Sequence, residues 1–185
     1  MATVTGGDRL RDLHAFDNTK AGVKGLVYAG VTAIPYFFHH KPDPIPVGVP
    51  SEDAAAAIPL IDLAKEDVDR GRVVAEVRAA AETVGFFQVV NDGVAGELMD
   101  AMLAVVRRFH EEPLEAKEPY YTRDLGSKVR FSSNYDLFRS PAVNWRDTLF
   151  MEMAPEGPLP EEIPPPCRGV AEEYATAAAA RGAAV

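Results

Sequence analysis

The sequence predicts an α/β (α+β) fold in which a strand–helix–strand unit is followed by a core-facing helix and a two-stranded hairpin. Residues 58–94 contain an apolar run, a helical pattern and a second apolar run. Residues 96–110 carry an apolar stripe at helical spacing, and residues 129–153 hold two strand-like segments around a turn. Each of these three stretches supports one part of the predicted fold.

The strand–helix–strand unit has the clearest signals. Pro59 confines the first strand to a sheet edge or a strand start, because proline donates no ladder hydrogen bond. A helix is predicted over residues 69–84, and Gly85 ends it. Aromatic and β-branched residues at Phe86, Phe87, Val89 and Val90 predict a buried strand that Asn91-Asp92-Gly93 closes with a turn. The predicted apolar face of the helix consists of Val73, Val77, Ala80, Ala81 and Val84.

The segment before this unit predicts a short helix within residues 8–30. Asn18 or Thr19 can cap this helix, and Gly30 can terminate it. Its apolar face would be formed by Val23, Leu26 and Val27. The four prolines of residues 41–50 then indicate a linker that extends to residue 57.

The segment after the unit predicts one more helix and then the hairpin. The helix covers residues 96–110, and Pro113 forces the chain out of helical conformation at Glu112. Strands are predicted at residues 129–132 and 144–153, joined by a turn at 139–143. The stripe of the helix consists of Leu98, Met102, Val105, Val106 and Phe109, and we interpret the two methionines of the helix, Met99 and Met102, as packing.

Composition narrows the function classes. The 185 residues include 28 acidic and 19 basic side chains, a net charge of −9, which opposes binding to nucleic acid or anionic lipid. A single cysteine, Cys167, allows no internal disulfide and no thiolate metal cage, so we expect a reducing, cytoplasmic location. The most apolar early stretch, residues 22–38, is interrupted by Lys24, three glycines and Pro35, so no membrane span is expected.

Several phrases of the sequence resemble one family. "IPLIDL" followed by "GFFQVVNDGV" resembles the opening of the plant 2-oxoglutarate/Fe(II)-dependent dioxygenases. "AFDNTKAGVKGLVYAGVTAIPYFFHHKPD" and "SNYDLFRSPAVNWRDTLFMEM" are similar to the subgroup of 1-aminocyclopropane-1-carboxylate oxidase homologues. Asp92 stands where most members have His, a position that concerns turn and packing. The resemblance extends over residues 12–174 and implies an oxidoreductase of plant small-molecule metabolism.

The resemblance also implies a domain division and a site. The chain would comprise an N-terminal arm and proline-rich linker (1–57), the dioxygenase N-terminal region (58–153) and a proline-rich segment with an alanine-rich tail (154–185). The hairpin would be the first of an incomplete double-stranded β-helix, or jelly roll. Thr148 and Phe150, two apart on one strand face, would line the substrate pocket. From the residues alone, Phe150 could equally be core, and Trp145 and Arg146 could form a surface stacking pair.

A protein-borne iron site is not expected in this chain. The family holds iron with His-x-Asp/Glu and a distant His. His110 and Glu112 have this spacing, but residues two apart on a helix point about 200° apart. No histidine follows His110, and the adjacent His39 and His40 more often face solvent or pack as a pair. We therefore assign no catalytic residue and no metal ligand.

The alanine-rich tail completes the functional hypothesis. Residues 171–185 contain eight alanines and offer almost no apolar face, so we expect this tail to fray. The jelly roll that would bind Fe(II) and 2-oxoglutarate is missing, so we expect a truncated chain that binds neither and does not catalyse by itself. A small-molecule substrate is expected only if the jelly roll is present.

Two alternatives remain at this stage. One is a non-catalytic interaction module that self-associates through an exposed apolar surface or sheet edge. The other is an unrelated acidic α/β protein that would need a complete sheet within these residues.

Overall fold

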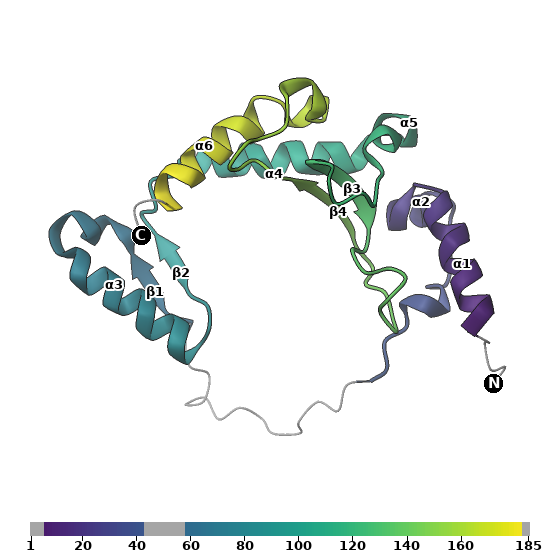
Figure 1. The fold of residues 1–185 in the computed structure, drawn as a ribbon, viewed down its shortest axis with the longest axis horizontal. Helices are drawn as coiled ribbons and strands as arrows, with labels where there is room; N and C mark the ends of the chain where they lie inside the picture. Colours follow the sequence, from purple (N-terminus) through teal and green to yellow (C-terminus); the bar gives the residue numbers. More distant parts are fainter. Residues whose placement is uncertain (1–5, 43–57, 183–185) are drawn as a thin grey trace. The chain divides into compact units, whose positions relative to one another are not determined.

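The structure is a computed structural model that describes residues 6–42 and 58–182 (Figure 1). Most of the predicted linker lies outside the described residues. By its internal contacts the chain divides into two compact units, Met1–Asp43 with Asp100–Glu172, and Pro44–Met99 with Glu173–Val185. We call them the first and the second unit. The described α-helices and strands are α1 (Gly6–Asn18), α2 (Gly22–Tyr28), β1 (Leu60–Asp62), α3 (Glu66–Thr83), β2 (Gln88–Val90), α4 (Gly96–Glu111), α5 (Leu114–Lys117), β3 (Val129–Ser133), β4 (Asp147–Met151) and α6 (Val170–Gly182). Short 3-10 turns lie at Tyr36–Phe38, Leu63–Lys65, Glu118–Tyr120, Pro160–Glu162 and Pro165–Cys167.

The second unit contains the predicted strand–helix–strand arrangement. Strand β1 pairs in parallel with β2, with Leu60 opposite Gln88, and α3 connects the two strands (Figure 1). A parallel pair needs such a crossover, because a tight turn cannot return the chain in the same direction. This part of the predicted fold is confirmed. Its core consists of Ile61, Leu63, Val73 and Ala80, with Val77 and Phe87 packed against them.

Helix α3 is kinked at Asp69, and a glycine follows its C-terminal end. Asp69 has non-helical φ and ψ of −149° and 73°, and its Oδ1 accepts a hydrogen bond from the Arg72 backbone N–H at 3.0 Å. Asp69 therefore acts as a cap, and regular helix follows it as predicted. At the other end Gly85, with φ of +86°, donates its N–H to the Ala80 carbonyl. This left-handed position explains why glycine ends the helix.

The predicted burial of the second strand is wrong. Phe86 is 57% exposed, and Val89 and Val90 are 40% and 38% exposed. Within the described residues β2 pairs with β1 alone, so its apolar composition did not predict its burial. Ala81, predicted on the buried face of α3, is also exposed.

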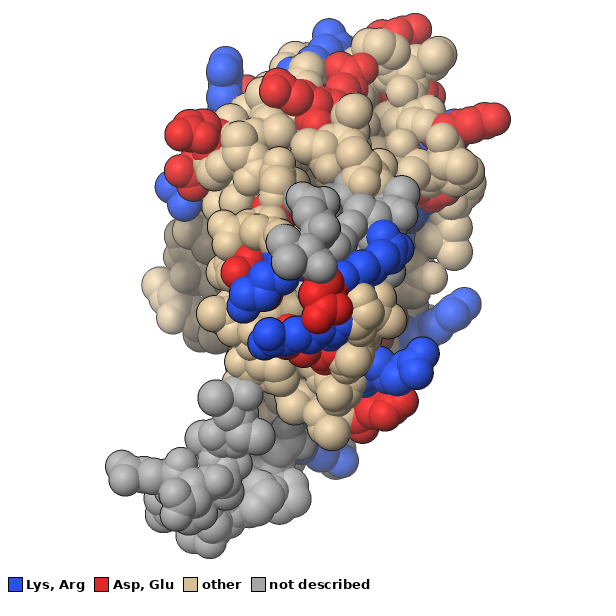
Figure 2. All heavy atoms as spheres, turned by 90° about the vertical axis from the view of Figure 1, so that its left-hand side faces the viewer, with Lys and Arg blue, Asp and Glu red and all other residues tan. Residues whose placement is uncertain are grey.

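The outer surface of the second unit carries charges of both signs. Arg72 and Glu76 on α3 form an ion pair of 2.8 Å between Nε and Oε1. Figure 2 shows blue and red side chains interspersed on the face that it draws, without a large field of one sign.

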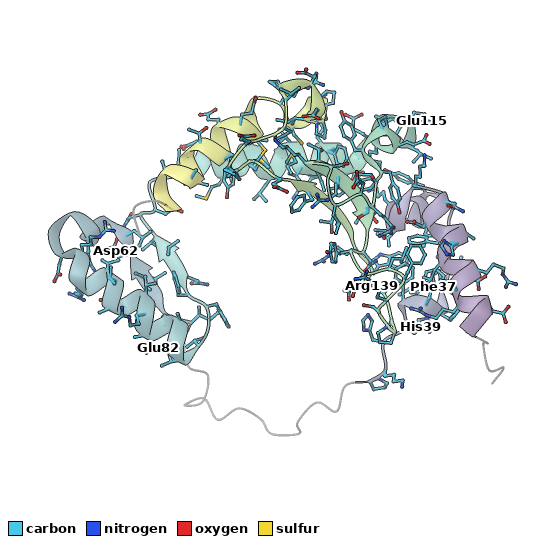
Figure 3. All side chains as sticks on the ribbon, viewed as in Figure 1. Phe37, His39, Asp62, Glu82, Glu115 and Arg139 are labelled. Atoms are coloured by element: carbon cyan, nitrogen blue, oxygen red, sulfur yellow. The ribbon has the colours of Figure 1, made fainter. Side chains whose placement is uncertain are left out.

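The first unit is built on two hydrophobic clusters. The arm cluster joins the N-terminal arm to the loop between β3 and β4, and the hairpin cluster lies between α4, the hairpin and the start of α6. In the arm, Phe37 packs against Phe16 and Phe38, with ring centroids 5.8 Å and 4.8 Å away (Figure 3). The arm cluster consists of Leu13, Phe16, Val23, Phe37, Phe38, Leu137 and Val143. The hairpin cluster consists of Phe109, Phe131, Ile163, Cys167 and Ala171, flanked by Met102, Val105, Tyr120, Tyr121, Leu149, Met151 and Met153.

The arm contains more helix than the sequence predicted. Helix α1 precedes Thr19, and α2 starts only at Gly22, so neither Asn18 nor Thr19 is its N-cap residue. Val23 is buried as predicted, but Val27 is 55% exposed. Gly30 follows the end of α2 with φ of +71°, which confirms the predicted stop.

Polar contacts also hold the arm to the rest of the first unit. Asp17 of α1 accepts hydrogen bonds from Arg123 Nη2 at 2.7 Å and Nε at 3.0 Å, and from the Tyr121 hydroxyl. Arg123 also donates to the carbonyls of Ser133 and Asn134, at 2.8 Å and 2.7 Å. Burial, together with the bond to Asp17, raises the pKa of Tyr121.

The other predicted elements of the first unit are present. Helix α4 buries Phe109 and half-buries the rest of its predicted stripe. Strands β3 and β4 form the predicted antiparallel hairpin, although β4 is shorter than the predicted strand of residues 144–153. The tail differs from its prediction, because α6 is helical to Gly182. Its first turn is anchored by Ala171, which is 1% exposed in the hairpin cluster. No helix in the described parts is long and apolar enough to cross a membrane.

Candidate functional site

The predicted pocket residues lie on the outward face of β4. The strand alternates between exposed and partly buried positions, which places Thr148 and Phe150 on one face and Leu149 and Met151 on the other. Leu149 and Met151 pack against the hairpin cluster. Phe150 is 41% exposed, so it is not a core residue.

Two residues of β3 complete this outward face. Arg130 pairs with Phe150 and Ser132 with Thr148 in the antiparallel register, so all four side chains lie on the same side of the hairpin. The Arg130 guanidinium carbon lies 3.9 Å from the centre of the Phe150 ring, a cation–π contact. We call Arg130, Ser132, Thr148 and Phe150 the outer face. The sequence prediction missed Arg130 and Ser132, although strand alternation on β3 could have placed them.

Arg130 is held in position by the loop before β3. Its Nη1 donates to the carbonyl oxygens of Leu125 and Ser127, at 3.0 Å and 2.5 Å. These two bonds and the Phe150 ring fix the plane of the guanidinium. A side chain restrained in this way loses little conformational entropy when it binds a ligand.

The first residue of β4 connects the outer face to the arm. Asp147 accepts hydrogen bonds from the backbone N–H groups of Val23 at 2.9 Å and Lys24 at 3.1 Å, so it caps α2 from 124 and 123 positions away. Gly22 is required there, because its φ is +63° and a Cβ would lie 2.3 Å from Asp147 Oδ1. No local sequence signal reveals this cap, since Ala21 occupies the N-cap position without a capping side chain.

A small hollow lies beside this cap. Its volume is about 340 Å³. Trp145 at its rim packs edge-on against Phe38, with ring centroids 4.9 Å apart. The predicted stacking partner of Trp145 was Arg146, whereas the aromatic contact that holds its ring comes from the arm. The hollow is lined by Val23, Lys24, Val27, His110, Trp145, Arg146 and Asp147.

His110 lines this hollow and packs against two aromatic rings. Its ring lies 5.8 Å from the ring of Phe131 and 5.5 Å from that of Phe109. Burial lowers the pKa of His110, because desolvation disfavours the imidazolium. Lys117 is 3% exposed, donates to the His110 carbonyl at 3.1 Å, and has its pKa lowered by the same cause.

The described residues do not fit an iron site. Nowhere in residues 6–42 and 58–182 do three His, Cys, Asp or Glu side chains gather closely enough to hold a metal ion. The ring nitrogens Nε2 of His39 and His40 instead lie 3.0 Å and 3.2 Å from the backbone carbonyls of Ile34 and Val143.

Comparisons with known proteins support a single family. The model of the family described as non-haem dioxygenase in morphine synthesis, N-terminal, matches residues 58–169. The chain is 43% identical over 177 residues to 1-aminocyclopropane-1-carboxylate oxidase homolog 3 of Arabidopsis thaliana, covering 90% of this chain and 47% of the relative. A homolog of the same oxidase from Solanum lycopersicum is 43% identical over 171 residues, covering 86% of this chain and 45% of the relative.

Similarity therefore runs through both units and the outer face. The chain is also 44% identical over 170 residues to 1-aminocyclopropane-1-carboxylate oxidase homolog 1 of Arabidopsis thaliana, covering 90% of this chain and 47% of the relative. The chain spans about half the length of the curated relatives that it matches. From the family model and these relatives together, the chain belongs to the plant 2-oxoglutarate/Fe(II)-dependent dioxygenase family, of which it carries the N-terminal region.

Proposed function

We propose that this chain is the N-terminal portion of a plant enzyme that uses 2-oxoglutarate and Fe(II) to oxidise a small plant metabolite in the cytoplasm. The observation that carries this proposal is the similarity to oxidase homologues, which continues over 90% of the chain at 43% identity. The outer face adds chemical support. It is an exposed sheet surface with an aromatic ring, two hydroxyls and a cation, which can orient a small organic molecule.

The metal and the oxoacid would be bound by residues outside these 185. Family members need a facial triad for iron, and no His follows His110 in this sequence. Nothing among the described side chains replaces it, because they offer no cluster of three metal-binding groups. The chain alone is therefore inactive in this proposal. Fe(II) and 2-oxoglutarate act only in the complete enzyme.

Thr148 and Phe150 would contact the substrate in the complete enzyme. Both point away from the hairpin cluster, so they are available to a ligand rather than needed for packing. Phe150 would contact an apolar part of the substrate, and the Thr148 hydroxyl would accept or donate a hydrogen bond. These roles predict effects on substrate oxidation that exceed effects on folding.

A chimaera tests the proposed function. The 185-residue chain is joined to the part of Arabidopsis thaliana homolog 3 that follows its matched region. Consumption of 2-oxoglutarate is measured with added Fe(II) for the chimaera, the 185-residue chain and the joined part alone. We expect turnover by the chimaera and none by the two separate parts. Turnover by the 185-residue chain alone would contradict its proposed inactivity, and a folded chimaera without turnover would contradict the proposed enzyme.

The proposed substrate contacts are tested in the same chimaera. The change Phe150→Ala removes the aromatic surface, and Glu115→Ala, at an exposed position of α5 away from the outer face, serves as the control. We expect Phe150→Ala to raise KM for the substrate about tenfold while 2-oxoglutarate affinity stays unchanged, since a lost aromatic contact costs on the order of 1–2 kcal/mol. Equal KM values for the two variants would refute the role of Phe150.

A further inference from the structure

We propose that Arg130 makes the outer face a carboxylate-recognition site, so that the substrate of the complete enzyme is a small organic acid with an apolar body. This inference rests on the proposed function, because it assumes that the substrate lies against Thr148 and Phe150. It adds the class of substrate, and it assigns a specificity-determining role to a residue of β3.

The first argument is the state of the Arg130 charge. The sequence holds 28 acidic residues, and several of its arginines form ion pairs with them. Arg72 pairs with Glu76, and Arg123 pairs with Asp17. Arg130 forms no ion pair with any carboxylate in the described ranges. Its neighbours are two carbonyls and the Phe150 ring, which orient the cation without neutralising it. The outer face therefore carries a fixed positive charge without an anionic partner among the described residues.

The second argument is the geometry of the guanidinium. Both hydrogen bonds that Arg130 makes to described residues run from Nη1, to Leu125 and Ser127. The Nε–H and Nη2–H groups form the other edge of the fork. This edge presents two parallel donors, the arrangement that binds a carboxylate through both oxygens. An amide or an alcohol has no pair of ionised oxygens that could accept hydrogen bonds from both donors.

The third argument is the chemistry beside the cation. The Phe150 ring lies directly under the guanidinium and is 41% exposed, so an apolar group next to the carboxylate finds a surface to cover. Ser132 and Thr148 lie opposite each other two residues along the strands, about 7 Å from the Arg130 pair. A ligand that spans this distance places a polar substituent at the hydroxyls. The outer face thus fits an aromatic or similarly flat acid of small size.

Binding of two matched probes to the 185-residue chain tests this proposal. The probes are trans-cinnamate and trans-cinnamamide, which share an apolar body and differ in the carboxylate. The chain is labelled with ¹⁵N, and the Arg130 Nε–Hε signal and the backbone amide signals of Thr148 and Phe150 are followed at neutral pH. We expect cinnamate to shift all three signals and to bind at least about tenfold more tightly than the amide, because its hydrogen bonds are charge-assisted.

Variants of Arg130 distinguish the effect of its two parallel donors from the effect of its positive charge. Arg130→Lys keeps the positive charge but lacks the two parallel donors, so we expect it to lose most of the preference for cinnamate. Arg139→Gln removes an exposed arginine from the loop between β3 and β4 and serves as the matched control, with no change expected (Figure 3). The remaining backbone signals of each variant report whether its fold is kept.

The outcomes distinguish this inference from the proposed function. If both probes bind equally at the outer face, or if Arg130→Lys keeps the full preference, carboxylate recognition is refuted while the substrate face stands. If neither probe shifts the three signals, recognition of an organic acid by Arg130 is refuted as well. Turnover of 2-oxoglutarate by the chimaera is measured independently of these results and alone decides the proposed enzyme.

Discussion

Removing the Asp147 carboxylate tests how the arm is attached to the hairpin. Asp147 accepts two backbone hydrogen bonds, from Val23 at 2.9 Å and from Lys24 at 3.1 Å. Asp147→Ala leaves both N–H groups of α2 without this partner. Loss of an N-cap costs about 0.5–2 kcal/mol, and hydrogen bonds to a charged group contribute about 1.5–3 kcal/mol. For this half-buried pair of bonds we expect the free energy of unfolding to fall by about 2 kcal/mol.

The single tryptophan gives this prediction a local readout. Trp145 lies two residues before Asp147 and packs on Phe38 of the arm, so its fluorescence reports on the attachment. In a urea titration, a loss of about 2 kcal/mol moves the midpoint down by about 1 M for a slope near 2 kcal/mol/M. Asp147→Asn keeps one acceptor oxygen and is expected to lose about half as much.

The matched control for this measurement is Glu152→Ala, which removes the same charge from an exposed site near the other end of β4. Its free energy of unfolding is expected to stay within about 0.5 kcal/mol of the unmodified chain, as for most surface substitutions, so its midpoint should move by no more than about 0.25 M. If Asp147→Ala and Glu152→Ala have equal midpoints, the cap does not hold the arm, and the reasoning is refuted.

Three further predictions concern buried or strained positions. Gly22→Ala should lower the free energy of unfolding by about 2 kcal/mol in the unmodified chain, but by only about 1 kcal/mol in the Asp147→Ala background. In that background the clash with the Asp147 carboxylate is gone and only the strain of the positive φ remains. Equal costs in urea titrations of the two backgrounds would contradict this. Folding raises the pKa of Tyr121 above 10.0, so its stabilising contribution is complete below that value and is lost as pH rises through the folded-state pKa. Stability measured from pH 9 upwards, about one unit below the unfolded pKa, should therefore decline more steeply for the unmodified chain than for Tyr121→Phe, and parallel curves would refute it. Burial raises the pKa of Cys167 to about 11, so iodoacetamide should modify the folded chain at pH near 8 at least about 100-fold more slowly than the urea-unfolded chain, and equal rates would show that the thiol is accessible.

Local pattern was sufficient for much of the fold. The strand–helix–strand unit, the stripe of α4 and the hairpin were all predicted from the sequence, because periodicity and turn residues act within a few positions of the chain. Gly85 and Gly30 stop helices for the same local reason, a backbone conformation that glycine adopts without strain. The family, too, was visible in short phrases of sequence.

Burial was predicted less well, because it depends on what else covers a side chain. Phe86 and Val90 have the composition of a buried strand, yet both are exposed in the second unit. From the sequence, Phe150 could be a core residue or a pocket residue. The alternation of β4 shows that Phe150 points away from the hairpin cluster, so it is not a core residue. Apolar composition states a preference for burial, while the packing of distant segments decides whether it is met.

The sequence by itself determined most of the elements, the family and the lack of a histidine after His110. Tertiary structure decided which side chains share a site. Asp147 caps a helix that lies 124 positions earlier, and Arg130 meets Phe150 across the hairpin. Such pairs depend on the folding of distant segments onto one another, and no local pattern encodes them, because periodicity describes each segment alone and not its partner.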